Sequence, residues 1–216
     1  NTSLVYLYCD GNGLTSLNVS NNLHLVELGC SRNQLTILDV SDLGNLELLH
    51  CYENYIAQLN IGGAVSLRHL HFANNQLADV NVSGQVALEE LRCDDNQLAN
   101  LNLSNNSSLR ILVCARNQLT TLNVSNLAAL EHLTCEGNEL SILDVSANSN
   151  LTWLSCYDNQ LCMLDVSGNV ALDYLNCGNN QLTSISTMVT NGGLVDGDAV
   201  DVRWNNLNQE IGRAHV

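Results

Sequence analysis

Cysteine recurs in this sequence at a fixed interval of twenty-one residues, and this period constrains the fold more than any other feature. A fixed period of about 20–50 residues is typical of proteins in which each repeat is one structural unit that stacks on its neighbours. The sequence therefore predicts a solenoid, in which no single coil encloses a core and only stacking makes the coils stable. The series comprises Cys9, Cys30, Cys51, Cys93, Cys114, Cys135, Cys156 and Cys177, with Phe72 at the one position where cysteine is missing.

Aligned on this period, the repeat has the consensus L-x-x-L-x-C-x-x-N-x-L-x-x-L-[DN]-V-S, followed by four variable residues. We number positions within a copy from its first leucine, so that the recurrent cysteine is position six. A tenth, irregular copy covers residues 200–207 and is displaced by four residues, after an irregular stretch over 186–198. The regular copies begin at Leu4, Leu25, Leu46, Leu67, Leu88, Leu109, Leu130, Leu151 and Leu172.

This consensus resembles the leucine-rich-repeat pattern, and most closely the twenty-one-residue bacterial class. That class includes internalin-like surface proteins, in which cysteine replaces the leucine of position six. The resemblance implies a right-handed coil with a parallel β-sheet along its concave face, an α/β-class horseshoe dominated by β-structure. It also implies a recognition function and a secreted or cell-surface location.

The residues around each cysteine support a strand independently of the resemblance. Leu28 and Cys30 alternate with Glu27, Gly29 and Ser31, so one face of the segment is apolar and the other is open. The second half of the repeat imitates the first, but it is short and rich in β-branched valine, which disfavours a helix. We therefore expect short extended or 3-10 segments on the convex side. Asparagine at position nineteen completes the imitation in Asn22, Asn106, Asn148 and Asn169.

Residues 1–210 are predicted to form a single domain of about ten coils, within a longer protein. Residues 211–216 do not continue the repeat. Written with the codons ATC GGA AGA GCA CAC GTC, they reproduce the start of a widely used sequencing adapter, so we expect a non-native tail. No apolar run approaches the roughly 20 residues that span a bilayer, so we expect no membrane insertion of this part.

The charge of the chain is strongly acidic and narrows the choice of partner. Twenty-two Asp and Glu residues stand against seven Arg and no Lys, which gives a net charge of −15. Binding to nucleic acid and to anionic membranes depends on cations that neutralise phosphates. The composition therefore argues against both and leaves a protein or a glycan as the expected partner.

Asparagine at position nine recurs in every copy and is interpreted as architecture. Its amide can bond to backbone groups of its own and of adjacent coils, at the turn that follows each strand. The cysteines receive a structural interpretation too, because stacked strands hold them about 4.8 Å apart, wider than the Cβ separation of a disulfide. The sequence has no C-x-x-C pair of the kind that binds zinc. Cys162 occupies position twelve, where all counterparts are small, so we expect tight packing there.

The sequence contains no recognisable catalytic set. The cysteines are predicted to point inward, no serine lies on a nucleophile elbow, and no glycine-rich phosphate loop is present. We therefore expect a non-enzymatic protein without a cofactor or a bound metal.

The candidate binding surface is the outward face of the predicted sheet, formed by positions three and five and continued by positions seven and eight. Seven of the eight Tyr and Trp residues fall at these positions, where burial does not require them. Exposed aromatic side chains anchor interfaces and stack on sugars. Trp153 and Tyr174 are expected to form a continuous aromatic platform. The predicted ligand-binding residues are Tyr6, Tyr8, Leu48, His50, Tyr52, His69, His71, Glu90, Arg92, Ile111, Val113, His132, Trp153, Tyr157, Tyr174, Asn176 and Trp204.

A histidine cluster on this face has two interpretations. His50, His69 and His71, together with Glu90, could hold a transition metal or form a pH-sensitive patch. Arg92 lies beside them, and its cation opposes a metal. The sequence thus favours a solvated histidine cluster.

The leading hypothesis is a recognition module that binds a protein or glycan on its concave face. The alternative is that these repeats direct a larger enzyme or effector, whose catalytic domain lies outside this sequence, to its substrate. A purely structural spacer is disfavoured by the aromatic residues on the outward face.

Overall fold

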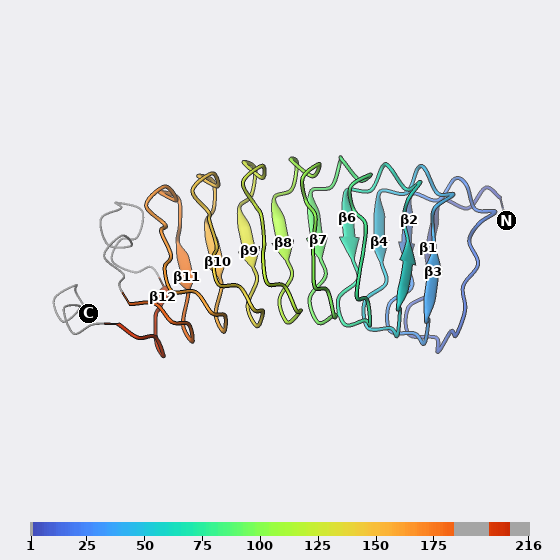
Figure 1. Ribbon diagram of the computed structural model, residues 1–216. Helices are drawn as coiled ribbons and strands as arrows, with labels where there is room; N and C mark the ends of the chain where they lie inside the picture. The colour runs from blue at the N-terminus through green and yellow to red at the C-terminus, as the bar shows by residue number, and fades with distance from the viewer. Residues whose placement is uncertain (1, 184–198, 208–216) are drawn as a thin grey trace.

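The computed structural model describes residues 2–183 and 199–207, and these form an elongated β-solenoid (Figure 1). Ten parallel strands make one sheet in the order β1-β2-β4-β6-β7-β8-β9-β10-β11-β12. The strands are β1 (Tyr6–Tyr8), β2 (Glu27–Gly29), β4 (Leu48–His50), β6 (His69–His71), β7 (Glu90–Arg92), β8 (Ile111–Val113), β9 (His132–Thr134), β10 (Trp153–Ser155), β11 (Tyr174–Asn176) and β12 (Ala199–Asp201). The predicted leucine-rich-repeat solenoid with a parallel sheet is confirmed.

The convex side is extended rather than helical. Two coils form short strands there, β3 (Ile37–Asp39) and β5 (Gln58–Asn60), which pair in parallel as a second sheet. The remaining convex segments are turns and irregular backbone, and no residue in 2–183 or 199–207 is helical. The expected extended segments are therefore present, whereas the described residues contain no 3-10 segment.

The strand register follows the repeat. Leu28 pairs with Leu49, its counterpart one period later, and the same spacing holds along the sheet as far as β11. At the last step Leu175 pairs with Val200, which confirms the four-residue displacement of the tenth copy. Residues 184–198 between these strands lie outside the described part of the chain, as does the predicted tail at 211–216. Within the described residues, no helix has the length and hydrophobicity to cross a membrane.

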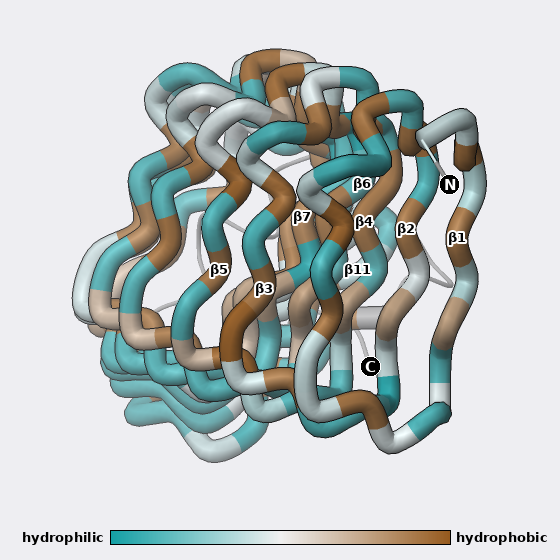
Figure 2. Tube along the Cα trace, turned by 90° about the vertical axis from the view of Figure 1, so that its right-hand side faces the viewer, coloured by the Kyte–Doolittle hydropathy of each residue, from teal (hydrophilic) through white to brown (hydrophobic). Residues whose placement is uncertain are grey.

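The core is a stack of identical layers. The leucine at the centre of each strand from β2 to β11 in the ten-stranded sheet is fully buried, and the leucines of positions one and eleven join it. Figure 2 looks along the solenoid, and successive coils repeat the same succession of hydrophobic and hydrophilic segments. Since each buried leucine contributes about 1.5–3 kcal/mol, the core depends on many equivalent layers rather than on one cluster.

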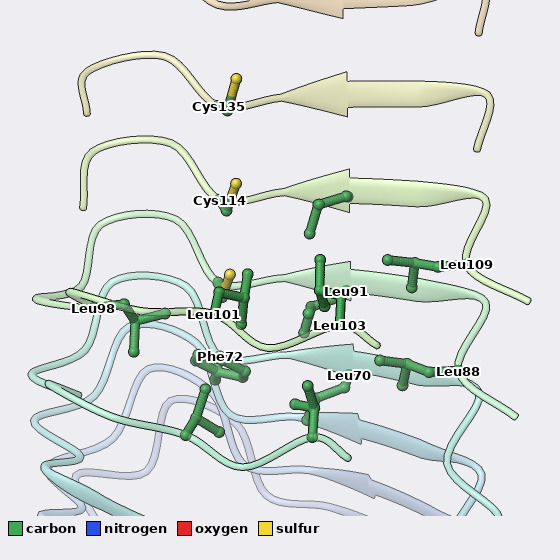
Figure 3. Packing of buried hydrophobic residues seen from close by; sticks show 14 of the residues in the cluster. Leu70, Phe72, Leu88, Leu91, Leu98, Leu101, Leu103, Leu109, Cys114 and Cys135 are labelled. Carbon is green, nitrogen blue, oxygen red and sulfur yellow. The ribbon is translucent and has the colours of Figure 1, made fainter. Parts of the chain in front are cut away.

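The cysteines of position six directly follow the strands of the ten-stranded sheet, and their side chains extend this core. Cys114 and Cys135 occupy the same place on successive coils, and the larger Phe72 fills the equivalent place in its own coil (Figure 3). The nine cysteines, all within the described residues, are free. Burial raises the pKa of the thiols at this position, to about 12 for Cys30 and for Cys177. They therefore act as small hydrophobic side chains.

The expectation of tight packing at Cys162 is wrong, because this side chain is exposed. All residues of position twelve lie on the surface, as Thr36 and Thr120 illustrate. Small size at this position thus does not reflect burial.

Titration of the native protein with a thiol reagent should therefore modify Cys162 quickly and the half-buried Cys9 more slowly. The seven fully buried cysteines should react only after denaturant is added, because burial both shields them and disfavours their thiolates. The measurement is the number of groups that react before and after unfolding, with Cys162→Ser as the control that removes the fast phase. Rapid reaction of several thiols in the native state would contradict this packing.

The position-nine asparagines join each coil to the preceding one. In coil five, the Asn96 side-chain nitrogen donates to the carbonyl oxygens of Phe72 (3.1 Å) and Cys93 (3.2 Å). It also donates to the carbonyl of Asp94 (3.2 Å), and its oxygen accepts from the backbone N–H of Leu77 (3.0 Å). The same pattern recurs along the solenoid, so the predicted architectural role is confirmed.

The residue before each of these asparagines has a left-handed backbone. Position eight has positive φ in all ten copies, for example 55° at Arg32, 54° at Asn74 and 57° at Trp204. This conformation costs about 1–2 kcal/mol for a residue with a Cβ atom. It turns the chain at the end of each strand and brings the next asparagine beneath the strand carbonyls.

Candidate functional site

The predicted binding residues lie on one face. In each strand of the ten-stranded sheet from β4 to β11 the central leucine is buried, while its two neighbours are turned outward and are mostly half-buried or exposed. Twelve of the predicted residues are these flanking positions, Tyr6 and Tyr8 flank the centre of β1, and Tyr52, Tyr157 and Trp204 lie in the turns that follow their strands. We call this outward side of the ten-stranded sheet the concave face. Tyr6, Tyr8 and Trp204 are the most exposed aromatic residues on it, at 57%, 61% and 64%.

A column of three rings occupies the C-terminal half of the face. Trp153 and Tyr174, which are paired in register, stack with ring centroids 3.6 Å apart and an interplanar angle of 7°. His132 stacks on the other side of Trp153 at 5.4 Å and 6°. Burial lowers the pKa of His132, and its Nε2 lies 3.0 Å from the Thr134 hydroxyl. We call these three residues the ring column.

The predicted platform of Trp153 and Tyr174 is a face-to-face stack, which His132 extends on the other side of Trp153. Both faces of the Trp153 ring are covered by its neighbours, so solvent meets the ring edges, and 37% of the residue is exposed. Ring edges carry the positive part of the aromatic quadrupole, and polar ring tips add hydrogen-bond donors. A ligand would therefore contact a surface of aromatic ring edges and hydrogen-bond donors. Across the face, Tyr157 contacts Trp204 edge-on at 6.3 Å, and the Arg203 guanidinium lies 5.0 Å above the Trp204 ring.

The N-terminal half carries the histidine cluster. His50 and His71 stack at 4.4 Å, and the Tyr52 ring is 6.2 Å from His50. The Glu90 carboxylate accepts a hydrogen bond from Arg92 Nε at 2.6 Å. Nearer the terminus, Tyr8 donates to Glu27.

Glu90 gathers the remaining members of the cluster. His69 Nδ1 lies 3.2 Å from one carboxylate oxygen. His71 Nε2 lies 3.2 Å from the other, but its geometry is not that of a hydrogen bond. Burial opposes ionisation of Glu90, yet the hydrogen bond from Arg92 and the neighbouring cations prevail and lower its pKa. Glu53, in the turn after β4, pairs with Arg32 at 3.1 Å.

The Glu90 carboxylate, the acidic member of the cluster, is already engaged by Arg92 and His69. Within residues 2–183 and 199–207, no three His, Cys, Asp or Glu side chains are arranged to hold a metal ion. Burial lowers the pKa of His50, and that of His71 to about 4, so both imidazoles are neutral at pH 7. The cluster is an internally bonded polar patch with one matched ion pair, Arg92 with Glu90.

Acidification should therefore destabilise the fold through His71. Its folded-state pKa of about 4 is below the value of 6.5 for an exposed imidazole, so the unfolded chain binds more protons between these pH values. The free energy of unfolding should fall as the pH drops from about 6.5 towards 4, with up to about 3 kcal/mol from this residue. The measurement is urea unfolding at several pH values of the parent and of His71→Gln. A stability difference between the two proteins that does not change with pH would contradict this linkage.

Sequence reasoning missed an acidic group beside the cluster. Arg116 donates twice to Asp95 at 2.6 Å, lies 3.2 Å from Glu136, and is 3.7 Å from Asp94. These residues occupy positions seven and eight, which are part of the predicted binding face. At these positions, however, only the aromatic residues are predicted to bind the ligand. The alternation of charge between Asp95 and Arg116, one period apart, was the signal that could have found them.

Comparison with solved structures places this geometry among known repeat proteins. The functional domain of InlJ from Listeria monocytogenes, described as including a cysteine ladder, is 34% identical with a TM-score of 0.87 and covers 90% of this chain. An internalin (inlF) from the same species is 26% identical with a TM-score of 0.78 and covers 97% of this chain and 70% of its own. YopM, a leucine-rich effector protein from Yersinia pestis, is 26% identical with a TM-score of 0.81, and the match covers 94% of this chain and 55% of YopM.

The present chain spans 43% of the InlJ chain. No protein-family model and no curated protein sequence matches it. The buried cysteine series nevertheless agrees with the cysteine ladder described for InlJ, and the TM-scores of 0.87 and 0.78 show that the chain shares its fold with both internalin structures. The chain is an internalin-like leucine-rich-repeat protein of the twenty-one-residue class, with a cysteine ladder.

Proposed function

We propose that this chain is a non-catalytic recognition module that binds a protein or glycan ligand on its concave face. The observation that carries the proposal is the concentration of aromatic residues there, with seven of the eight Tyr and Trp residues on one side of the solenoid. The leucine and cysteine layers hold the fold together without them. The contacts of these aromatic side chains can therefore contribute to the free energy of ligand binding.

The chemistry of the face supports recognition rather than catalysis. The neutral imidazoles, the ring edges and the small polar groups of Thr134, Ser155 and Asn176 can donate and accept hydrogen bonds across a broad surface. The seven fully buried thiols of the ladder cannot reach a substrate. The alternative, repeats that direct a separate catalytic domain, is not favoured by any feature of the described residues. A spacer would not need exposed rings.

The setting that we propose is a secreted or cell-surface protein. This rests on the internalin-like repeats, and one of the similar structures is itself described as an effector protein. A net charge of −15 supports a protein or glycan ligand over nucleic acid, whose phosphates would be repelled.

Tryptophan fluorescence tests the location of the ligand. The chain has two tryptophans, so Trp204→Phe leaves Trp153 in the ring column as the only source of tryptophan fluorescence. Oligosaccharides and extracellular protein domains would be screened for binding, and a true ligand should change the emission of Trp153, because binding desolvates the ring edges. The matched protein Trp153→Phe reports from Trp204. A ligand that binds tightly without changing either emission would show that recognition occurs elsewhere.

A further inference from the structure

The concave face has a cavity in coils three to five that the ring column does not share. Its volume is about 430 Å³, and it is lined by His50, Tyr52, His71, Ala73, Arg92 and Asp94. Tyr52, Ala73 and Asp94 are the position-seven residues of successive coils. Two coil steps of about 4.8 Å separate the tyrosine from the aspartate, and alanine contributes only a methyl group between them. This leaves a slot with an aromatic ring at one end and a carboxylate at the other.

The acidic end of the slot has more negative than positive charge. The Arg116 guanidinium is shared by three carboxylates, and it is bidentate with Asp95, so Asp94 is the most distant at 3.7 Å. The Asp94 side chain is only 18% exposed. Burial raises its pKa, which means that the ionised form is short of stabilising contacts. A further cation would therefore balance part of the negative charge of this group.

At the aromatic end of the slot, the face of the Tyr52 ring that points away from the slot already contacts a guanidinium. Arg32 belongs to coil two, and its guanidinium lies 5.7 Å above the Tyr52 ring. The opposite face of the ring is therefore turned towards coil four, where Ala73 leaves it uncovered. Planar guanidinium groups stack on such faces, and their N–H groups pair with carboxylates in a fork.

We propose that this slot binds an arginine side chain of a protein partner, with the guanidinium stacked on Tyr52 and hydrogen-bonded to Asp94. The proposal rests on the recognition function proposed above and names the partner as a protein with an exposed arginine. The span and the charge both fit, because a guanidinium can lie up to about 6 Å from a ring centroid, and its N–H groups reach a carboxylate about 3 Å further on when its plane is tilted towards that carboxylate.

The other lining residues permit a cation. The charge of Arg92 is matched by Glu90, to which it donates at 2.6 Å. His50 and His71 are neutral at pH 7 because burial lowers the pKa of each. The overall charge of −15 would also attract a basic partner over longer distances.

The test uses the full chain and three short peptides, acetyl-Gly-X-Gly-amide with X as arginine, lysine or citrulline. Citrulline has the shape of arginine without its charge. NMR titration at pH 7 should show that the arginine peptide shifts the ring signals of Tyr52, His50 and His71, and binds more tightly than lysine. The arginine peptide should bind at least about tenfold more tightly than citrulline, the size of effect expected of a charge-assisted hydrogen bond.

Variants separate the slot from general charge. Asp94→Asn should remove the preference for arginine over citrulline, and Ala73→Phe should do the same by filling the slot. Asp158→Asn, an exposed carboxylate on the rim of coil eight, should leave it intact. Equal binding of the arginine and citrulline peptides, or an unchanged preference in Asp94→Asn, would overturn the proposal. If Trp153 still responded to its own ligand in that case, the arginine slot alone would be rejected and the recognition function would stand.

Discussion

Replacing Asn96 with alanine should lower the free energy of unfolding by about 1–3 kcal/mol, because a buried group left without a partner costs about that much. The variant leaves the Leu77 N–H without its acceptor, and the carbonyls of Phe72 and Cys93 each lose a donor. Asn96 is 9% exposed and lies in the middle of the solenoid, so water cannot easily replace these bonds. Urea unfolding monitored by circular dichroism provides the measurement.

Two further variants make this experiment specific. Gln97→Ala removes an exposed amide from the adjacent residue and should change stability by no more than about 0.5 kcal/mol. Asn96→Asp keeps an acceptor for the Leu77 N–H but turns lone pairs towards the carbonyls, so it should be at least as destabilising as alanine at neutral pH. If Asn96→Ala and Gln97→Ala unfolded at the same urea concentration, the asparagines would not be what couples the coils.

The second asparagine series shows why the two halves of the repeat are not equivalent. Asn148 donates to the carbonyls of Val124 and Leu127, but none of the described residues donates to its side-chain oxygen. Position nineteen therefore makes fewer bonds than position nine, and leucine or alanine replaces asparagine there in coils two and three. The apparent symmetry of the sequence indicated similar backbone paths, whereas the stability of each ladder depends on how many partners its amide meets.

Most of the fold was predictable because its causes are periodic. Burial of leucine, the parallel register and the coupling by asparagine all repeat at the same interval, so each copy supports the interpretation of the next. The left-handed backbone at position eight was missed because residues as different as Arg32, Glu53 and Trp204 occupy it. A weaker signal was present, since Gly, Asn or Asp fills that position in coils one, four, five and seven to nine, and these residues tolerate positive φ best.

The site was less predictable than the fold, since side-chain contacts are not periodic. The position of Trp153 next to Tyr174 followed from the register, but which part of each ring faces solvent depended on rotamers that sequence does not determine. The exposure of Cys162 was missed for a related reason, because small residues are common both in tight packing and on a smooth surface. The acidic group around Arg116 required the geometry of three coils at once.

Changing Trp153 to alanine should weaken binding of the concave-face ligand by about thirtyfold or more, since truncation of a true aromatic anchor typically costs about 2 kcal/mol. The indole is the middle ring of the column, so its loss also leaves His132 and Tyr174 without their shared neighbour. The fold should survive, because the side chain lies outside the leucine core and the residue is 37% exposed. Affinity would be measured by calorimetry with whichever oligosaccharide or protein domain the fluorescence screen identifies.

The matched control is Thr121→Ala on the convex side, where the side chain is exposed and far from the ten-stranded sheet. Tyr174→Phe adds a finer comparison, since it keeps the stack and removes only the phenolic hydroxyl at the exposed edge. If the ring edges recognise the ligand through their polar tips, Tyr174→Phe should lose part of the affinity that Trp153→Ala loses. If stacking alone mattered, it should lose none. Equal affinity of Trp153→Ala and Thr121→Ala would instead place the binding surface away from the ring column, because no contact with that column could then contribute to the complex.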